Sequence, residues 1–302
     1  MAGRLAATRI PWGAVPLSGG RSRRGSSRVV RGFLRDPAAV VGAVALAAVG
    51  LVLAATPWLG LRDPLETNVP ERLAPFSWAH PLGTDTIGRD MLSRVLYGGR
   101  SSVALTLAVT LMVTVLGLIM GIVAGMRGGI VDSAVMRVIE VIQTLPFVIV
   151  AMVAVKFLGG GPQKLVFVLA ALGWTGQARV VRAATLSLRE RDFVRASRAL
   201  GCSRLRLAAR HIVPNLLSPV VVLATLDVGR TLLALSTLSF LGFGARPPHP
   251  EWGSMLADAR ASFYSTPRLL IIPGMAIVIV ALAANLFGEG LRDAFEARTA
   301  GT

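Results

Sequence analysis

Apolar runs of membrane-spanning length recur six times along this 302-residue chain, and they restrict its possible folds strongly. The bilayer core holds no water for a free backbone N–H or C=O, so each run must form a helix of about 20 residues. The composition agrees, because 53% of the residues are hydrophobic and only 16% are charged. We therefore predict an all-α, polytopic membrane protein with six transmembrane helices. The expected spans cover residues 37–59, 102–126, 134–158, 164–185, 213–240 and 269–288.

Positive charge is concentrated in two segments that flank the spans. Residues 1–36 hold eight Arg and one Asp, and residues 179–210 hold nine Arg and two acids, so each segment has a net charge of +7. Arginine-rich short segments stay in the cytoplasm, which gives the orientation. Anionic lipid and topology account for this charge, and nucleic acid is not expected as a partner. The predicted N-terminal segments are a disordered basic cytoplasmic tail (1–36), a first transmembrane helix (37–59) and an extracytoplasmic segment (60–100). A core with five spans (101–290), which includes a cytoplasmic insert (190–212), and a cytoplasmic C-terminal tail (291–302) follow.

The sequence has no motif for catalysis, nucleotide binding or metal binding. It lacks a Gly-x-x-x-x-Gly-Lys-Ser/Thr loop, and its three histidines are scattered without ligand spacing. Its one cysteine, Cys202, cannot form an intramolecular disulfide. We therefore expect no catalytic residue, no metal and no cofactor bound by this chain. Any energy source must then come from another subunit or from an ion gradient.

The polar insert at residues 191–215 has the pattern of two short helices joined by a bend. Phe193 and Leu200 follow one helical face at i and i+7. Gly201 supplies a left-handed position that ends a helix, and Ser203 is placed to cap the next one. Spacing alone leaves two interpretations open. The insert either offers a docking surface to a soluble partner or lies as a basic amphipathic loop against lipid headgroups.

Four blocks of the sequence carry a resemblance to a known family. They are His80 to Arg100 (HPLGTDTIGRDMLSRVLYGGR), Arg191 to Asn215, Leu238 to Gly253, and Gly288 to Ala294 (GEGLRDA). In that order, they resemble the outer segment, the cytoplasmic coupling motif, the fifth helix with its outer loop, and the C-terminal ending of the C-type permease subunits of dipeptide, oligopeptide and nickel ABC importers. The resemblance covers most of the chain and implies the permease fold of type I ABC importers.

The resemblance implies a transport subunit and not an enzyme. It implies one half of a heterodimeric pore in a bacterial cell membrane, with both termini in the cytoplasm. The implied partners are a B-type permease subunit, two cytoplasmic ABC ATPases that use ATP and Mg, and an extracytoplasmic substrate-binding protein.

The implied solute is a short peptide that moves inward by alternating access. Nickel chelates, glutathione and other small solutes are carried by similar permeases. An ion-gradient secondary transporter or channel is the alternative from another class, and it would be expected to show inverted repeats or broken midplane helices. No clear repeat is seen in the sequence.

The resemblance also implies which residues couple the chain to the ATPases. They are Phe193, Arg195, Ala196, Ser197, Leu200, Gly201 and Pro214. Pro214 suits the first turn of the next helix, where a missing amide is tolerated. The chain departs from the family motif at Arg195, where a glutamate is usual, and at Ser197, where the second alanine is usual. The reversed charge requires either an acidic feature on the ATPase or a side chain that faces solvent.

Charged residues in the fifth span and in the outer segment give two further candidate sites. Asp227 and Arg230 are three residues apart, so they either line a substrate path or pair to lock helices together. The acids and bases of residues 80–100 predict an internally bridged surface helix that leads into the second span. The candidates for a rim that docks the binding protein are Asp85, Arg89, Asp90 and Trp252.

Overall fold

The computed structural model describes residues 32–245 and 248–300, and within them the chain is helical and contains no β-strand. This confirms the all-α prediction for the described residues. Expectations for the basic tail at residues 1–31 lie outside them. The helices are α2 (Pro37–Ala55), α3 (Met91–Arg127), α4 (Gly129–Thr144), α5 (Phe147–Phe157), α6 (Pro162–Arg189), α7 (Asp192–Ala199), α8 (Arg204–Leu207), a π-helical turn (Ala208–Ile212), α9 (Val213–Phe240), α10 (Trp252–Ala259) and α11 (Arg268–Ala300).

Five helical segments of the described chain are long and apolar enough to cross a membrane, and a sixth crossing requires α4 and α5 to count as one span. These two helices meet at 96°, so the prediction of a regular span over residues 134–158 is wrong in its geometry. The break is at Leu145, which is extended with ψ 142. Proline forces the residue before it out of the helical region, and Pro146 has no amide to continue the helix.

Three glycines bring α3 and α6 into close contact. Gly117, Gly121 and Gly125 recur every four residues and lie along the side of α3 that faces α6. A Cβ added to Gly121 would lie 2.6 Å from the Cβ of Val181 and 2.7 Å from the carbonyl oxygen of Ala178. Small residues of this kind let membrane helices approach closely, where packing is the main source of association. The seam therefore fixes α6 against α3.

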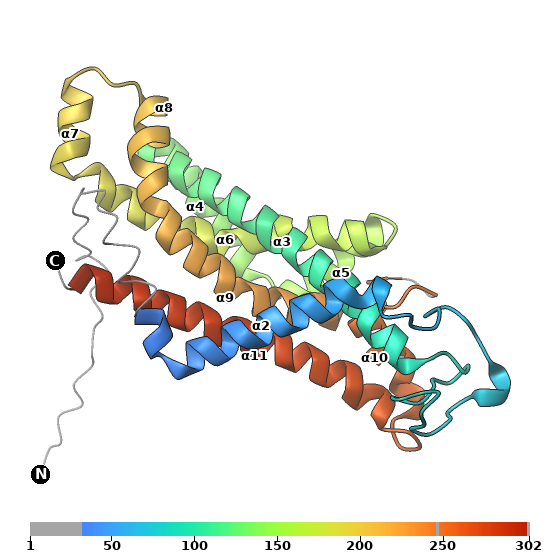
Figure 1. Cartoon of the computed structure of the whole chain (residues 1–302). Helices are drawn as coiled ribbons and strands as arrows, with labels where there is room; N and C mark the ends of the chain where they lie inside the picture. Colours follow the sequence, from blue (N-terminus) through green and yellow to red (C-terminus); the bar gives the residue numbers. More distant parts are fainter. Residues whose placement is uncertain (1–31, 246–247, 301–302) are drawn as a thin grey trace, which may run out of the picture.

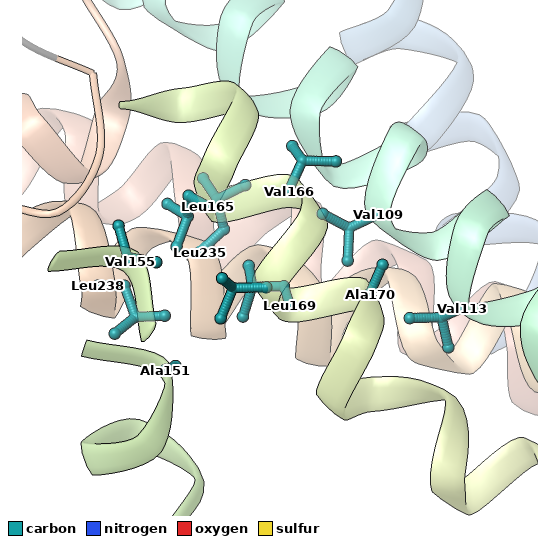
Figure 2. Close-up of a cluster of buried hydrophobic side chains, with 11 residues drawn as sticks. Val109, Val113, Ala151, Val155, Leu165, Val166, Leu169, Ala170, Leu235 and Leu238 are labelled. Atoms are coloured by element: carbon teal, nitrogen blue, oxygen red, sulfur yellow. The ribbon is translucent and has the colours of Figure 1, made fainter. Parts of the chain in front are cut away.

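An apolar cluster joins α3, α5, α6 and α9 in the half of the bundle that contains α5. Figure 2 shows side chains from these helices gathered between the ribbons. Leu165, Leu235 and Leu238 are completely buried there, and Val109 and Leu169 are each 2% exposed. Lipid tails are as apolar as leucine, so the cluster stabilises the bundle through packing contacts more than through removal from water.

The first helix, α2, lies on the outside of the bundle against α11 (Figure 1). Asp36 begins α2, because its carboxylate accepts the backbone amide of Ala38 at 3.0 Å. Gly42 allows the close approach to α11, since a Cβ there would lie 2.8 Å from the carbonyl oxygen of Ala283. Much of the rest of α2 is exposed, including Leu51 at 70%, and is free to face lipid.

The two ends of the bundle carry different structures (Figure 1). At one end, α7 and α8 lie near the C-terminal end of α11. At the other end lie α10 and the segment between α2 and α3. The structure therefore places the basic insert and the C-terminal end of α11 at the same end of the bundle.

Candidate functional site

The insert forms two short helices that are anchored in the core of the bundle. Val194 of α7 is 1% exposed, and Leu207 and Ile212 are completely buried. These side chains pack in one cluster with Leu188 of α6 and Leu216 of α9. Both helices that enter and leave the insert therefore contribute to its core. A displacement of α7 must move side chains of α6 and α9.

The bend between α7 and α8 confirms the helix–bend–helix prediction. Gly201 has φ +80, a left-handed conformation that glycine adopts without steric cost. The amide of Cys202 donates to the carbonyl oxygen of Ser197 at 3.1 Å, and so closes the end of α7. The hydroxyl of Ser203 accepts the amide of Arg206 at 3.4 Å and caps α8. Pro214 is the second residue of α9 and directly follows the π-helical turn, so the helix runs through it from α8.

Two apolar side chains expected to dock a partner are exposed on the insert, Leu200 at 89% and Phe193 at 39%. Leu205, which was not among the expected residues, is 81% exposed beside them in α8. Ala196 is also exposed, on the same helix as Phe193. The ring of Phe193 rests beside that of His211, with ring centroids 6.2 Å apart. A large apolar area is therefore presented to the surroundings at a rigid bend.

The unusual Arg195 pairs with an acid of its own chain. Its guanidinium donates to the carboxylate of Glu190 at 2.6 Å, and both side chains are more than half exposed. This hydrogen bond lowers the pKa of Glu190 and raises that of Arg195. The Arg195 side chain is therefore exposed, and an acidic feature on the ATPase stays a prediction. Ser197 donates its hydroxyl to the carbonyl oxygen of Phe193 at 2.8 Å, so it has a local partner within α7.

A chain of polar side chains crosses the middle of the bundle at Asp227. Arg230 lies 3.9 Å from its carboxylate, one helical turn away on α9. The amide of Gln177 on α6 donates to Asp227 at 2.7 Å and to the hydroxyl of Thr114 on α3 at 3.3 Å. Asp227 therefore pairs with Arg230 and also bridges helices. The Arg230 side chain is 84% exposed and needs water or a protein partner within the membrane.

Sequence reasoning did not connect Gln177 with Asp227. The signal available was a polar amide within an apolar span, because such a group must find a hydrogen-bond partner. The partner itself, 50 residues away, follows only from how α6 and α9 pack.

The outer segment before α3 is a buried network and not the surface helix that its spacing suggested. Helix α3 begins only at Met91, and Asp90 caps it by accepting the amide of Ser93 at 2.8 Å. Gly83 and Gly88 have φ +72 and +83, which breaks any helix over residues 80–90.

Part of the predicted internal bridging of this outer segment forms, while Asp90 is hydrogen-bonded to His80 at 2.9 Å. Arg89 pairs with Asp85 at 2.6 Å, and Arg89 and Arg94 each lie 3.5 Å from the carboxylate of Asp258, next to the end of α10. The network therefore joins the outer segment to the last turn of α10, more than 150 residues away in the sequence.

The four residues expected at a docking rim are all buried. Asp85, Arg89 and Asp90 are 5–6% exposed and Trp252 is 2% exposed. The indole of Trp252 donates to the carbonyl oxygen of Val95 at 2.8 Å, which fastens α10 to α3. Buried side chains cannot contact a partner. These four residues therefore stabilise the outer end of the bundle from inside and do not form a docking surface.

Comparison with known proteins agrees with this geometry. Residues 117–301 match the model of the family described as binding-protein-dependent transport system inner membrane component. The dipeptide transport system permease protein DppC of Haemophilus influenzae is 35% identical over 270 residues, which are 87% of this chain and 92% of that protein. A putative peptide transport system permease protein of Brucella abortus is 38% identical over 290 residues, which are 94% of this chain and 97% of that protein.

A solved structure shows the same fold. The chain resembles an inward-facing conformation of the MetNI methionine ABC transporter with a TM-score of 0.54 at 20% identity, over 68% of this chain and 97% of that one. At this identity the likeness concerns the fold alone, and it confirms the prediction of a type I ABC importer permease fold. From the family match and the length of chain shared with these relatives, this protein belongs to the binding-protein-dependent transport system inner membrane components, the permease subunits of ABC importers.

Proposed function

We propose that this chain is one half of a heterodimeric pore that moves short peptides into the cell, driven by ATP hydrolysis on separate subunits. Its partners in this proposal are a B-type permease, two cytoplasmic ABC ATPases that use ATP and Mg, and an extracytoplasmic binding protein. The names of its relatives, which are dipeptide and peptide permeases, support the peptide as solute. No covalent chemistry by this chain is needed.

The observation that carries the proposal is the attachment of the exposed bend to the transmembrane core. Val194 and Leu207 of the insert pack with α6 and α9, while Leu200 at the bend is exposed. A soluble ATPase that grips Leu200 would therefore move both helices. A loop that only rested on lipid headgroups would not need this rigid connection.

The substrate path is proposed to run along the exposed side of Asp227 and Arg230. Arg230 needs a polar environment, and a water-filled passage between two permease halves supplies one. Gln177 holds the Asp227 carboxylate in place, so the same side chains both link helices and line the path.

Reconstitution tests the proposal directly. The chain would be purified with its B-type permease, ATPases and binding protein, placed in lipid vesicles, and supplied with dipeptides. ATP-dependent uptake and peptide-stimulated ATP hydrolysis are expected. Uptake that needs no ATPase and follows an imposed proton or sodium gradient would instead identify an ion-gradient transporter.

The proposed orientation places residues 186–212 and the chain ends in the cytoplasm. In a Cys202→Ser background, a cysteine at Ser203 should resist a membrane-impermeant thiol reagent in intact cells. A cysteine at Thr67, which is exposed at the opposite end of the bundle, should react. Labelling of position 203 from outside would reverse the orientation and remove the coupling role of the insert.

A further inference from the structure

A buried histidine at the outer end of the bundle has contacts that one protonation state cannot satisfy together. His80 is 4% exposed and lies in the segment between α2 and α3. Its Nδ1 is 2.9 Å from the carboxylate of Asp90, and its Nε2 is 3.1 Å from the carboxylate of Glu71. A guanidinium nitrogen of Arg62 lies 3.2 Å from the same Nε2. Two side chains of opposite charge therefore meet at one ring nitrogen.

The Nδ1 atom has a single role. A carboxylate only accepts hydrogen bonds, so Nδ1 carries a proton when it is bonded to Asp90. The other carboxylate oxygen of Asp90 accepts the amide and the hydroxyl of Ser93, each at 2.8 Å, and so caps α3. The Nδ1 contact therefore holds the carboxylate that begins α3.

The Nε2 atom has two partners that exclude each other. Glu71 only accepts, so it requires a proton on Nε2, and the ring is then a charged imidazolium. Arg62 only donates, so it requires a bare Nε2, and the ring is then neutral with its proton on Nδ1. Histidine is the side chain that normally changes its charge between about pH 5 and pH 8. Each protonation state of His80 therefore suits one of the two partners.

We propose that His80 is a protonation switch of the outer segment. Its Nε2 donates to Glu71 when the ring is charged and accepts from Arg62 when the ring is neutral, while Nδ1 stays on Asp90. Protonation thus fastens the helical turn Val69–Glu71 to the start of α3, and loss of the proton moves the link to the stretch that follows α2. The switch belongs to this chain alone and depends on neither the solute nor the ATPases.

The other charged side chains near this segment have partners of their own. Asp85 pairs with Arg89 at 2.6 Å, and Arg94 lies 3.5 Å from Asp258. Arg268 of α11 donates to two backbone carbonyl oxygens, at 2.9 and 2.7 Å. Among the described residues, the three charged side chains within hydrogen-bonding distance of the ring are therefore the ones that decide its state.

The test reads the ring nitrogens directly by solid-state NMR of the 302-residue chain in lipid bilayers. The chain has three histidines, so His211→Gln and His249→Gln leave His80 as its only one. Histidine labelled with nitrogen-15 then reports which ring nitrogens carry protons as the pH is varied between about 5 and 8. We expect a neutral ring protonated at Nδ1 and, at lower pH, a ring protonated at both nitrogens.

Two surface variants should move the titration in opposite directions. Glu71→Gln keeps an acceptor but removes the negative charge, so the pH at which half of the rings are protonated should fall by about one unit. Arg62→Met removes a positive charge and the donor to the neutral ring, so this pH should rise by a similar amount. The control is Glu66→Gln, another exposed acid of the same segment, which should shift nothing.

Deuterium exchange measures whether the switch fastens the turn. After division by the intrinsic exchange rate at each pH, the amides of residues 69–72 should be several-fold better protected at about pH 5 than at about pH 8. Glu71→Gln should remove this difference.

Three results would overturn the inference. One is a neutral ring with its proton on Nε2, since Arg62 could not then donate to it. Another is an unchanged titration, or shifts of the same sign, in Glu71→Gln and Arg62→Met. The third is equal protection of residues 69–72 at both pH values. Because Arg62 and Glu71 are exposed, their substitution leaves the packing of the bundle in place.

Discussion

Replacement of Gly201 by valine should lower both peptide uptake and peptide-stimulated ATP hydrolysis while leaving the protein in the membrane. Gly201 has φ +80, and a Cβ placed there meets no other atom within 4 Å. The cost of the substitution is therefore backbone strain and not a collision with neighbours. For a residue with a side chain, the left-handed conformation costs about 1–2 kcal/mol, and β-branching makes it less accessible still.

This magnitude translates into a measurable loss. A cost of 1.4 kcal/mol lowers the population of the native bend about tenfold relative to any relaxed conformation of the loop. The spans are not strained by the change, because Gly201 lies between α7 and α8. We expect membrane expression and assembly with the other permease to be kept, and both peptide uptake and peptide-stimulated ATP hydrolysis to fall about tenfold in reconstituted vesicles.

Two further variants make the reasoning refutable. Gly201→Asn should retain most activity, since asparagine adopts the left-handed conformation more readily than valine. Gly242→Val imposes the same kind of strain at the far end of α9, where φ is +92 and a Cβ also meets nothing. It should lower thermal stability without uncoupling hydrolysis from uptake. Normal uptake and normal stimulation in Gly201→Val would refute the coupling role of the bend.

Three other substitutions test the remaining parts of the structure. Gly121→Val should prevent the close contact of α3 with Val181 and lower stability by about 1–3 kcal/mol or more, seen as loss of monodisperse protein in detergent. Glu251→Ala should lower the free energy of unfolding by about 3 kcal/mol, because this fully buried carboxylate caps α10 and the amides that donate to it would lose their acceptor. An unchanged melting temperature would contradict this. Asp227→Asn keeps an acceptor for Gln177 but removes the charge beside Arg230, so uptake should fall while ATPase retention and melting temperature hold; a lower melting temperature would assign Asp227 to helix locking alone.

The regular part of the fold could be predicted from the sequence because membrane spans are local features. Five of the six apolar runs correspond to long helices, and the bend at Gly201 follows from a glycine at the end of a short amphipathic stretch. The break in the remaining run, residues 134–158, is also encoded locally, by the pair Leu145 and Pro146. The run nevertheless has the length and hydropathy of one straight span, and neither property shows where a helix changes direction.

The buried ion-pair network at the outer end could not be predicted, because its members are far apart in the sequence. Spacing identified Asp85 and Arg89 as a pair, but nothing local placed Asp258 beside them. Ser254 likewise follows an outer loop in the sequence, but it lies in α10 with 8% exposure, and its amide donates to the buried carboxylate of Glu251. Charge pattern shows which residues can pair, and only packing shows whether the pair faces solvent.

The hydrogen bond between Gln177 and Asp227 lies on the two helices that flank the insert, α6 and α9. Helix α6 leads into α7, and α9 leaves through the π-helical turn after α8. The same two helices carry Gln177 and Asp227, whose hydrogen bond joins them at 2.7 Å. We propose that a force applied at Leu200 would reach both helices through the packed core of Val194 and Leu207. A shift of α6 relative to α9 would then change the geometry between Gln177 and Asp227, and with it the position of the charge that faces Arg230.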